Sequence, residues 1–389
     1  MKVAYDISQT YSNPAGCGYY ANIFYQKLQE FDDVDVLGLK SFGGLFYDVE
    51  FNNNLLSSSP NFINLSLTDC INFWDEYSFN DKKYSDLGSP DIVHSNNFFF
   101  PPTSNYCQNV FTLYDLSFFD NPSWTSEANW SICSKGVFEA SYKADHIVTI
   151  SEYSKKRFLM LFPNFNEEKV SLIYPTSRFE NYKLNKSYKA PKKFKSIEFF
   201  LSVGTLEPRK NHIGVLTAYL NFIKAYGDNP PLLVFVGGQG WLFDETSKFI
   251  KENNLSEYII FAGYVSDDDL FWLYKNCLLN IYFSTYEGFG MPVLEALSAN
   301  ALTITSNIEP FGELFGDAII KPDIKDQLKF LTDFMFQVAT KTEQFNYLND
   351  DKKTLRDKFD LNTNSKKLVN LYHSLVDLSL IHISEPTRR

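Results

Sequence analysis

Short apolar runs, rich in β-branched and aromatic residues, alternate along most of the chain with longer stretches of helical character, such as 212–226 and 268–277. Several of these runs are apolar at nearly every position, which is typical of strands covered on both faces. Strand–helix alternation of this kind predicts parallel sheets joined by right-handed crossovers. The predicted strands are 2–7, 34–39, 91–95, 109–113, 146–150, 170–174, 199–204, 232–236, 258–262, 278–284 and 302–306.

The alternation breaks at 181–196, a lysine-rich segment without periodicity that reads NYKLNKSYKAPKKFKS. Such a composition is typical of an interdomain linker. We therefore predict an α/β protein of two doubly wound, Rossmann-like domains, 1–180 and 197–360, facing each other across a cleft. Residues 361–377 are expected to form a C-terminal helix that packs back on the first domain. In such domains ligands bind beyond the carboxyl ends of the strands, so the loops after the strands form the candidate site.

The charge of the chain is acidic and unevenly distributed. Its formal net charge is -11, and residues 1–180 hold 12 Lys and Arg against 22 Asp and Glu, which accounts for ten of the eleven excess negative charges. This sign of charge repels nucleic-acid phosphates, and the sequence has no basic stripe with interleaved aromatic residues. We therefore exclude nucleic acid as a partner, whereas the basic triplet 155–157 leaves a local contact with anionic lipid open.

The cysteines and the two ends of the sequence indicate the cellular compartment of the protein. The five cysteines are odd in number and widely spaced, and the sequence has no CxxC, so we predict neither a disulfide framework nor a zinc site. The chain enters its first predicted strand directly after Met1, without a signal peptide, and has no apolar run of about 18 residues for a membrane span. These features predict a cytoplasmic protein, free or peripheral at the inner face of the membrane. Residues 378–389 include LSLIHISEPTR, which resembles a translated sequencing adapter, and we leave them out of the fold as an artefact tail.

The segment 285–296, TYEGFGMPVLEA, follows a predicted strand and leads into a predicted helix. Gly288 and Gly290 allow the backbone to approach a ligand closely, and the helix N-terminus behind them favours an anionic phosphate. Glu287 and Glu295 flank this turn eight positions apart, so we expect both carboxylates to face one ligand, with Glu295 binding ribose hydroxyls. The alternative is a plain strand–turn–helix with two solvated glutamates.

A second segment, 199–211, is predicted to end a strand at Gly204 and then presents Arg209 and Lys210 within the sequence EPRKN. A ligand or leaving group that carries phosphate is negatively charged. The two cations can neutralise that charge without a metal, the arginine as a bidentate fork. The alternative is a surface turn with two solvated cations.

These two segments resemble the Glu-x7-Glu and EPRKN motifs of retaining GT-B glycosyltransferases, specifically glycosyltransferase family 4. The resemblance spans about residues 1–376 and is most specific in the second half. It implies that Glu295 holds the nucleotide ribose, that Glu287 lies near the donor hexose, and that Lys210 and Arg209 bind the diphosphate. The donor-binding residues between the two glutamates are then Gly288, Phe289, Gly290 and Met291.

A third segment of the second half fits the same resemblance. Residues 261–270, FAGYVSDDDL, are similar to a family segment whose backbone commonly contacts the base, which implies donor contacts for Tyr264 and Val265. We interpret Ser266 and the acidic triplet after it as a helix cap, and not as a metal-binding Asp-x-Asp motif.

The first half carries a weaker form of the resemblance. Residues 13–20, NPAGCGYY, resemble the family's glycine-rich acceptor-side loop, so Gly16 and Gly18 are expected to let this loop close on the diphosphate. In the segment FTLYDLSF, Tyr114 replaces a histidine that contacts the donor sugar in relatives, whereas Asp115 is retained. In the second half, Thr205 stands where many relatives carry an arginine. Tyr114 implies changed sugar binding or reduced activity, and Thr205 implies that the diphosphate contact carries over most firmly to Lys210.

The resemblance implies a metal-independent hexosyltransferase that needs no cofactor beyond its nucleotide sugar, with Glu287, Lys210 and Asp115 as catalytic residues. Its expected reaction moves a hexose, with GDP-mannose as the preferred donor, to a saccharide or lipid-linked saccharide acceptor. Configuration would be retained, and the product would serve surface-polysaccharide or glycoconjugate assembly. Three alternatives stay open: a non-catalytic nucleotide-sugar-binding homologue, a GT-B-fold nucleotide-sugar epimerase, and a two-domain sugar-binding module.

Overall fold

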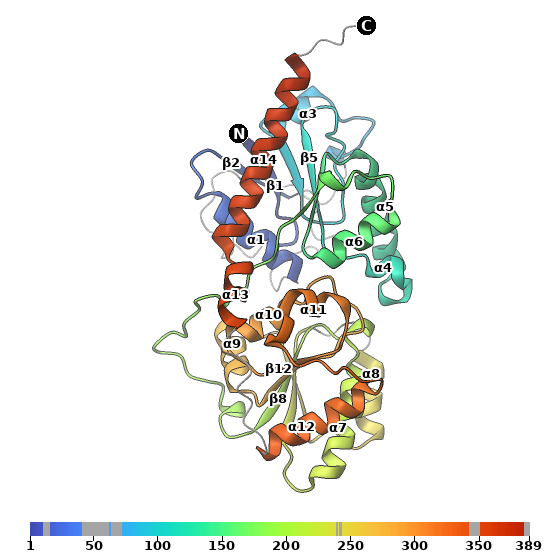
Figure 1. The fold of residues 1–389 in the computed structure, drawn as a ribbon, viewed down its shortest axis with the longest axis vertical. Coiled ribbons are helices and arrows are strands. Elements are labelled where there is room, and N and C mark those ends of the chain that lie inside the picture. Colours follow the sequence, from blue (N-terminus) through green and yellow to red (C-terminus); the bar gives the residue numbers. More distant parts are fainter. Residues whose placement is uncertain are drawn as a thin grey trace. The chain divides into compact units, whose positions relative to one another are not determined.

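The computed structural model describes residues 1–10, 16–40, 62–63, 72–238, 240, 243–341 and 351–384. The chain divides into two compact units. The first consists of Met1–Thr176 together with Asp357–Arg389, and the second consists of Ser177–Arg356. Each unit is built around its own parallel sheet (Figure 1). The predicted fold class, two Rossmann-like α/β domains, is therefore confirmed.

The first unit contains a seven-stranded parallel sheet in the order β3-β2-β1-β4-β5-β6-β7. Chain order reverses at β1, as in dinucleotide-binding folds, so β1 and β4 mark the point beyond which ligands bind in such sheets. Of these strands, only the two-residue β3 was not predicted. The strands are β1 (Lys2–Asp6), β2 (Asp35–Leu39), β3 (Phe62–Ile63), β4 (Ile92–Ser95), β5 (Gln108–Leu113), β6 (His146–Thr149) and β7 (Val170–Leu172).

Two helices of the first unit, α5 and α6, begin at serine side-chain caps that the sequence supplies. Ser126 accepts a hydrogen bond from the Asn129 N–H, and Ser151 accepts one from the Ser154 N–H, so α5 and α6 start where an N–H would otherwise lack a partner. The helices are α1 (Gly16–Leu28), α3 (Asp81–Asp86), α4 (Ser117–Asp120), α5 (Glu127–Lys143), α6 (Glu152–Leu161) and α14 (Leu361–Ser384). The short helix α13 (Asp351–Lys358) spans the boundary at which the chain returns to this unit.

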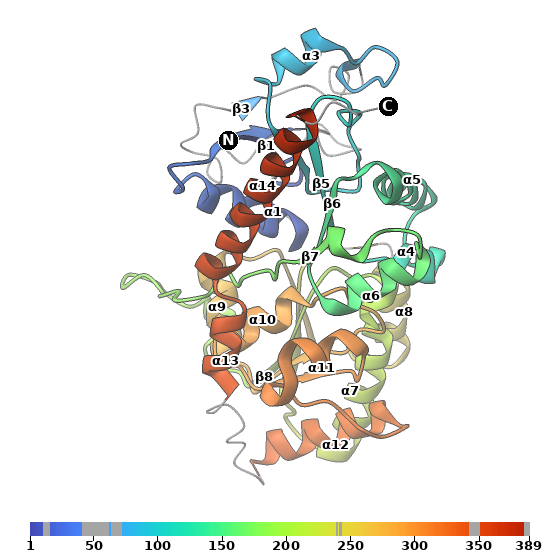
Figure 2. The ribbon, with the colours of Figure 1, turned by 45° about the horizontal axis from the view of Figure 1, so that its top comes forward.

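The C-terminal helix α14 runs beside α1 in both views of the ribbon (Figure 2). A buried polar chain anchors it: the Tyr372 hydroxyl is hydrogen-bonded to His94 Nδ1, and His94 Nε2 lies 2.7 Å from Thr112 Oγ1. The Thr112 hydroxyl donates to Asn96 Oδ1 at 2.8 Å. Because its proton is used there, the Thr112 oxygen accepts from the Nε2–H of His94. His94 Nδ1 then carries no proton and accepts from the Tyr372 hydroxyl. Burial lowers the pKa of His94 to about 3, which keeps the ring neutral as this pattern requires.

The second unit contains a five-stranded parallel sheet in the order β10-β9-β8-β11-β12. Apolar residues fill both faces of its central strands, as the continuous apolar runs predict. The strands are β8 (Phe199–Val203), β9 (Leu232–Val236), β10 (Ile259–Gly263), β11 (Leu279–Tyr282) and β12 (Thr303–Thr305). The helices are α7 (His212–Tyr226), α8 (Phe243–Glu252), α9 (Asp267–Asn276), α10 (Met291–Ser298), α11 (Glu309–Phe315) and α12 (Gln327–Thr340).

The segment expected as a linker, 181–196, lies within the second unit, whose boundary falls between Thr176 and Ser177. Three consecutive aspartates at the start of α9 hold this part of the chain. They accept hydrogen bonds from Arg178, Tyr182 and Tyr188 at 2.8, 2.8 and 2.7 Å, respectively. Ser266 caps the same helix by accepting from the Asp269 N–H at 3.2 Å, which confirms the capping interpretation. The acidic triplet therefore has two structural roles: it accepts hydrogen bonds from the preceding segment, and it forms the first turn of the capped helix α9.

Two further findings concern the described residues only. No helix among them combines the length and the apolar character needed to cross a membrane. Four of the cysteines, Cys17, Cys107, Cys133 and Cys277, are not joined in a disulfide, whereas Cys70 lies outside the described residues.

Candidate active site

The turn between β11 and α10 is held in one conformation by its glycine and its aromatic neighbours. Gly290 has a φ of 98°, in the left-handed region, and a Cβ there would lie 2.7 Å from the Phe311 ring. Phe289 is buried against Phe315, and Met291 opens the helix. Gly288 is buried as well. A side chain at position 290 would therefore push the turn away from the helix N-terminus.

The loop after β8 ends in a single 3₁₀ turn, Pro208–Lys210, which carries both predicted cations. Asn211 closes this turn with a φ of 55°, a left-handed conformation that asparagine adopts more readily than most residues. The Thr285 N–H donates to the Arg209 carbonyl oxygen at 2.7 Å. This bond joins the loops that follow β8 and β11, two strands that are neighbours in the sheet.

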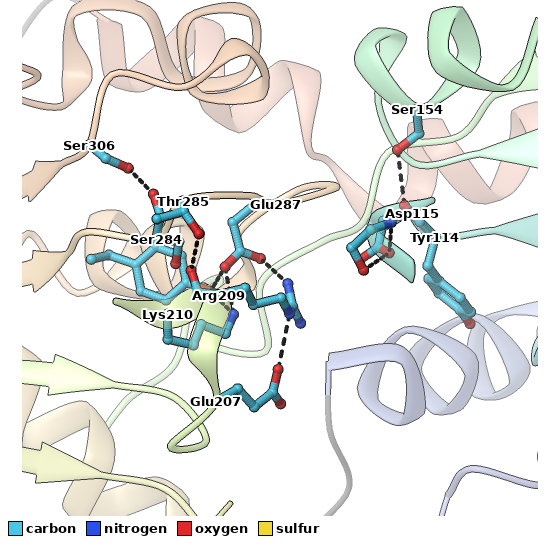
Figure 3. A network of polar contacts seen from close by, with 12 residues as sticks. Tyr114, Asp115, Ser154, Glu207, Arg209, Lys210, Ser284, Thr285, Glu287 and Ser306 are labelled. Atoms are coloured by element: carbon cyan, nitrogen blue, oxygen red, sulfur yellow. Dashed lines mark hydrogen bonds and ion pairs between the residues drawn. The ribbon is translucent and has the colours of Figure 1, made fainter. Parts of the chain in front are cut away.

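Glu287 is the centre of a buried polar cluster (Figure 3). Its Oε1 accepts from Lys210 Nζ at 2.6 Å and from the Tyr282 hydroxyl at 2.9 Å, and its Oε2 accepts from Arg209 Nη1 at 3.1 Å. Lys210 also donates to the Tyr282 hydroxyl at 2.5 Å, and Arg209 Nε donates to Glu207 at 3.0 Å. The fold brings three predicted residues together here, whereas Tyr282 and Glu207 were not among the predicted site residues.

The electrostatics of this cluster favour an ionised pair. Burial on its own raises the pKa of Glu287, but the adjacent Lys210 and Arg209 outweigh that effect and bring the pKa down to about 2. Burial lowers the pKa of Lys210 and Arg209 lowers it further, whereas Glu287 opposes both. Because Lys210 and Arg209 are both paired with Glu287, the alternative of a surface turn with two solvated cations is wrong.

Glu295 belongs to a second cluster with different partners. Arg178 Nε lies 2.9 Å from its Oε1, Arg178 Nη2 lies 3.3 Å from its Oε2, and the Tyr274 hydroxyl donates to Oε2 at 3.2 Å. Glu295 is 2 % exposed, and burial raises its pKa although Arg178 opposes that shift. Arg178 follows the first unit's last predicted strand in a stretch without any motif, so sequence reasoning had no signal that would single it out.

The loops that follow β9 and β10 meet the loop that follows β8 at the carboxyl ends of these strands. The Gly237 N–H donates to the Gly263 carbonyl oxygen at 3.0 Å, and the Leu206 N–H donates to the Gly238 carbonyl oxygen at 3.2 Å. A Cβ on Gly238 would lie 2.7 Å from the Tyr264 hydroxyl. Tyr264, predicted to contact the base, is 57 % exposed, and Val265 follows it in the same loop.

The candidate residues of the first unit gather around the start of α1. Gly16 is the first residue of this helix and Gly18 is buried in its first turn, whereas 13–15 lie outside the described residues. The Tyr114 hydroxyl donates to the Asn96 carbonyl oxygen at 3.0 Å and lies 3.4 Å from that of Cys17, within the same turn. Tyr114 therefore ties the loop after β4 to the glycine-containing start of α1.

Asp115 lies two residues before α4, the short helix that follows β5. Its Oδ1 accepts from the Ser117 N–H at 3.0 Å and from the Ser117 hydroxyl at 2.8 Å. The Ser154 hydroxyl donates to the Tyr114 carbonyl oxygen at 3.0 Å, which fixes the backbone just before Asp115 (Figure 3). Asp115 thus has a structural contact that the sequence did not indicate.

Among the described residues, no group of three or more His, Cys, Asp or Glu side chains is arranged to hold a metal ion. The groups that gather in the second unit's two clusters are three cations, two buried carboxylates, two tyrosines and a helix N-terminus behind a glycine turn. Such a set of groups can bind an anionic, hydroxylated ligand, since helix N-termini and cations attract phosphate and carboxylates accept from hydroxyls.

Residues 185–335 match the family model described as Glycosyl transferases group 1. The chain is 30% identical over 243 residues to O-antigen chain mannosyltransferase B of Escherichia coli, which covers 60% of this chain and 62% of that protein. It is 29% identical over 183 residues to O-antigen chain mannosyltransferase RfbU of Salmonella typhimurium, which covers 46% of this chain and 48% of that protein. The chain therefore spans less than two thirds of the length of these curated relatives.

Solved structures with the same fold match almost the whole chain. Anabaena Alr3699/HepE in complex with UDP and glucose superposes with a TM-score of 0.73 at 16% identity, covering 96% of this chain and 100% of that one. Sucrose-phosphate synthase from Thermosynechococcus elongatus superposes with a TM-score of 0.68 at 14% identity, covering 97% and 100%. At such identities the likeness shows the fold alone. The chain thus has the GT-B fold, and the part of it that matches the glycosyl transferases group 1 family model is residues 185–335.

Proposed function

We propose that this protein is a hexosyltransferase that moves a sugar from a nucleoside-diphosphate donor to a saccharide or lipid-linked saccharide acceptor. The observation that carries the proposal is the buried cluster of Lys210, Arg209 and Glu287 beside the turn that opens α10. An ammonium group has three N–H donors. Lys210 directs two of them to Tyr282 and Glu287. The third is left for a phosphate oxygen.

The donor that we propose is GDP-mannose. Its support is similarity: the curated relatives include several proteins named as O-antigen or serotype-specific mannosyltransferases. The same similarity supports a place in surface-polysaccharide assembly, and a further relative is named for transfer to an undecaprenol-diphosphate-linked sugar.

A thermal-shift screen tests the donor without knowledge of the acceptor, because a ligand that binds the folded state raises the melting temperature. The panel contains GDP, UDP, ADP and dTDP with their common sugar conjugates. We expect GDP and GDP-mannose to raise the melting temperature, and the Lys210→Met variant to lose most of that rise. A shift with UDP compounds alone would reject the GDP assignment and keep the enzyme class. A flat response of folded protein across the panel would reject nucleotide-sugar binding.

We propose that the reaction retains configuration and needs neither a metal nor another cofactor. In this mechanism Lys210, Arg209 and the helix start behind Gly288 and Gly290 stabilise the charge on the departing diphosphate. Glu287 lies beside the hexose, and the departing phosphate helps to deprotonate the acceptor. We propose Asp115 as a further catalytic residue. Transfer that is unchanged by EDTA, with an α-linked product from an α-linked donor by NMR, is the expected result.

We also propose that the protein binds the membrane surface through the face formed by α5 and α6. Half of the ten large apolar side chains exposed in the described chain lie on these two helices: Trp130, Phe138, Tyr142, Met160 and Leu161. Phe138 of α5 contacts Phe162, the residue that follows the end of α6. Aromatic and aliphatic side chains beside lysines are typical of helices that lie in a lipid interface.

Vesicle flotation tests this surface. We expect the protein to float with vesicles of phosphatidylethanolamine and phosphatidylglycerol, and the Tyr142→Ser, Met160→Ser double variant to lose most of that binding. Tyr77→Ser is the matched control, because Tyr77 is exposed outside these helices. Equal flotation of all three proteins would reject the α5–α6 surface.

A second candidate function is a non-catalytic homologue that binds nucleotide sugar. Tyr114 and Thr205 favour it, because each replaces a residue that relatives use toward the donor. It predicts a thermal shift with a nucleotide sugar but neither transfer nor slow hydrolysis of the donor. Donor hydrolysis that is lost when Lys210 is substituted would support the enzyme and reject the non-catalytic homologue.

A further inference from the structure

Arg178 connects two carboxylates that lie on different helices of the second unit. Its Nη1 lies 2.8 Å from Asp267 at the start of α9, and its Nε and Nη2 lie 2.9 and 3.3 Å from the two oxygens of Glu295 in α10. The guanidinium also lies over the Phe179 ring, 5.1 Å from its centroid. The arginine is thus held from several sides while it faces Glu295 with two nitrogens.

This arrangement fixes the plane of the Glu295 carboxylate. Nη2 donates a hydrogen bond to Oε2, and Nε lies at ion-pair distance from Oε1, so one planar guanidinium faces both carboxylate oxygens, which a single point charge such as lysine does not do. The Tyr274 hydroxyl adds a third contact, to Oε2. A carboxylate has about four acceptor sites, so these three contacts leave room for a further donor on Oε1.

An unpaired carboxylate is costly to bury in its charged form. Glu295 is 2 % exposed, and Arg178 is the cation that pairs with it among the described residues. Removing the guanidinium therefore removes both the orientation and the charge compensation of this acceptor, and leaves the Lys210–Glu287 cluster with its own partners.

We propose that Arg178 is a positioning residue that holds Glu295 ionised and aimed at the ribose hydroxyls of the bound nucleotide, so that this protein distinguishes ribonucleotides from their deoxy analogues. The inference rests on the proposed function, in which Glu295 binds the ribose. The structural feature that points to it is the two-nitrogen contact of Arg178 with a buried carboxylate near the sheet edge.

Isothermal titration with two matched ligand pairs tests it: GDP against 2′,3′-dideoxy-GDP, and UDP against 2′,3′-dideoxy-UDP. The wild type is expected to bind the ribonucleotide of one pair about tenfold or more tighter, since hydrogen bonds to a charged group are worth that much. Arg178→Met is expected to lose most of this preference while it binds the dideoxy analogue as the wild type does. Glu295→Gln should behave similarly, and the double variant should lose little more.

Arg178→Lys keeps the charge without the planar fork, so an intermediate preference is expected. If circular dichroism shows that Arg178→Met does not fold, the ribose preference of Arg178→Lys serves as the test instead. Arg157→Met is the control, because Arg157 pairs with Asp120 in the other unit and its loss should change neither affinity.

Equal weakening of ribo and dideoxy ligands in the Arg178 variants would show a merely structural role and overturn the inference. An unchanged preference in those variants would overturn it as well. A wild type that binds nucleotide without any ribose preference would reject the role of Glu295. A folded wild type that binds none of the four ligands would reject the proposed function itself.

Discussion

Lys210 Nζ lies 2.6 Å from Glu287 Oε1, although 77 positions separate the two residues along the chain. Both side chains are largely buried, and Arg209 contacts the other oxygen of the same carboxylate. The contact depends on β8 and β11 being neighbours in the sheet, because each residue follows one of these strands. The pair links stability to the proposed chemistry, since each partner favours the charged form of the other.

Lys210→Met is expected to reduce stability by about 3 kcal/mol, because it leaves a buried carboxylate with one cation fewer. The double variant Lys210→Met, Glu287→Gln is expected to be more stable than the single lysine variant, since the uncompensated charge is then gone. Urea unfolding of the four proteins of this cycle measures the coupling. A double variant that is less stable than Lys210→Met would contradict the arrangement. Under the proposed function, the rate of sugar transfer should fall by roughly 10²–10³-fold in both Lys210→Met and the double variant.

The pKa of Glu287 predicts a loss of stability in acid. The pKa is about 2 in the folded protein against an ordinary 4.5, so the folded state binds this proton less readily than the unfolded state. The carboxyl thus contributes stability that is present above pH 4.5 and is lost as the pH falls toward 2, up to roughly 3 kcal/mol. Comparing wild type with Glu287→Gln from pH 6 down to 2 isolates this group. Parallel stability curves for the two proteins would contradict the prediction.

Gly290→Ala is expected to destabilise the protein by roughly 2–4 kcal/mol. Its φ of 98° strains any L side chain, and the new Cβ would lie 2.7 Å from Phe311. Gly312→Ala is the control, because Gly312 lies in helix α11 with nothing within 4 Å of a new Cβ. That substitution should be neutral or add about 0.5–1 kcal/mol. Thermal unfolding of both variants makes the comparison, and similar losses in both would refute the role of the turn.

Tyr372→Phe tests the buried chain that anchors α14. It removes the donor to His94 Nδ1 and leaves that nitrogen without a partner in a buried site, which should cost about 1–3 kcal/mol. Tyr77→Phe removes a hydroxyl from a side chain that is 98 % exposed and should change stability by less than about 0.5 kcal/mol. Hydrogen exchange should show earlier opening of α14 in the Tyr372 variant alone. Exchange at wild-type rates would mean that the apolar contacts with α1 suffice.

The sequence determined the elements and the loops that carry the candidate site. The apolar runs correspond to the observed strands with shifts of one or two residues, because strands buried on both faces need uninterrupted apolar positions. The two-residue β3 was missed, since a pairing so short leaves no pattern. The glycine turn, the adjacent cations and the acidic cap of α9 were visible because each depends on local backbone geometry and neighbouring charges.

Only the tertiary structure decided which side chains meet. Glu287 and Glu295 look alike in the sequence, yet one is held by Lys210 and Arg209 and the other by Arg178 and Tyr274. Tyr114 and Asp115 likewise acquired contacts with Asn96 and Ser117 that no motif indicated. The physical reason is that strand order brings together loops far apart in the chain, whereas sequence patterns report only the few residues around each position.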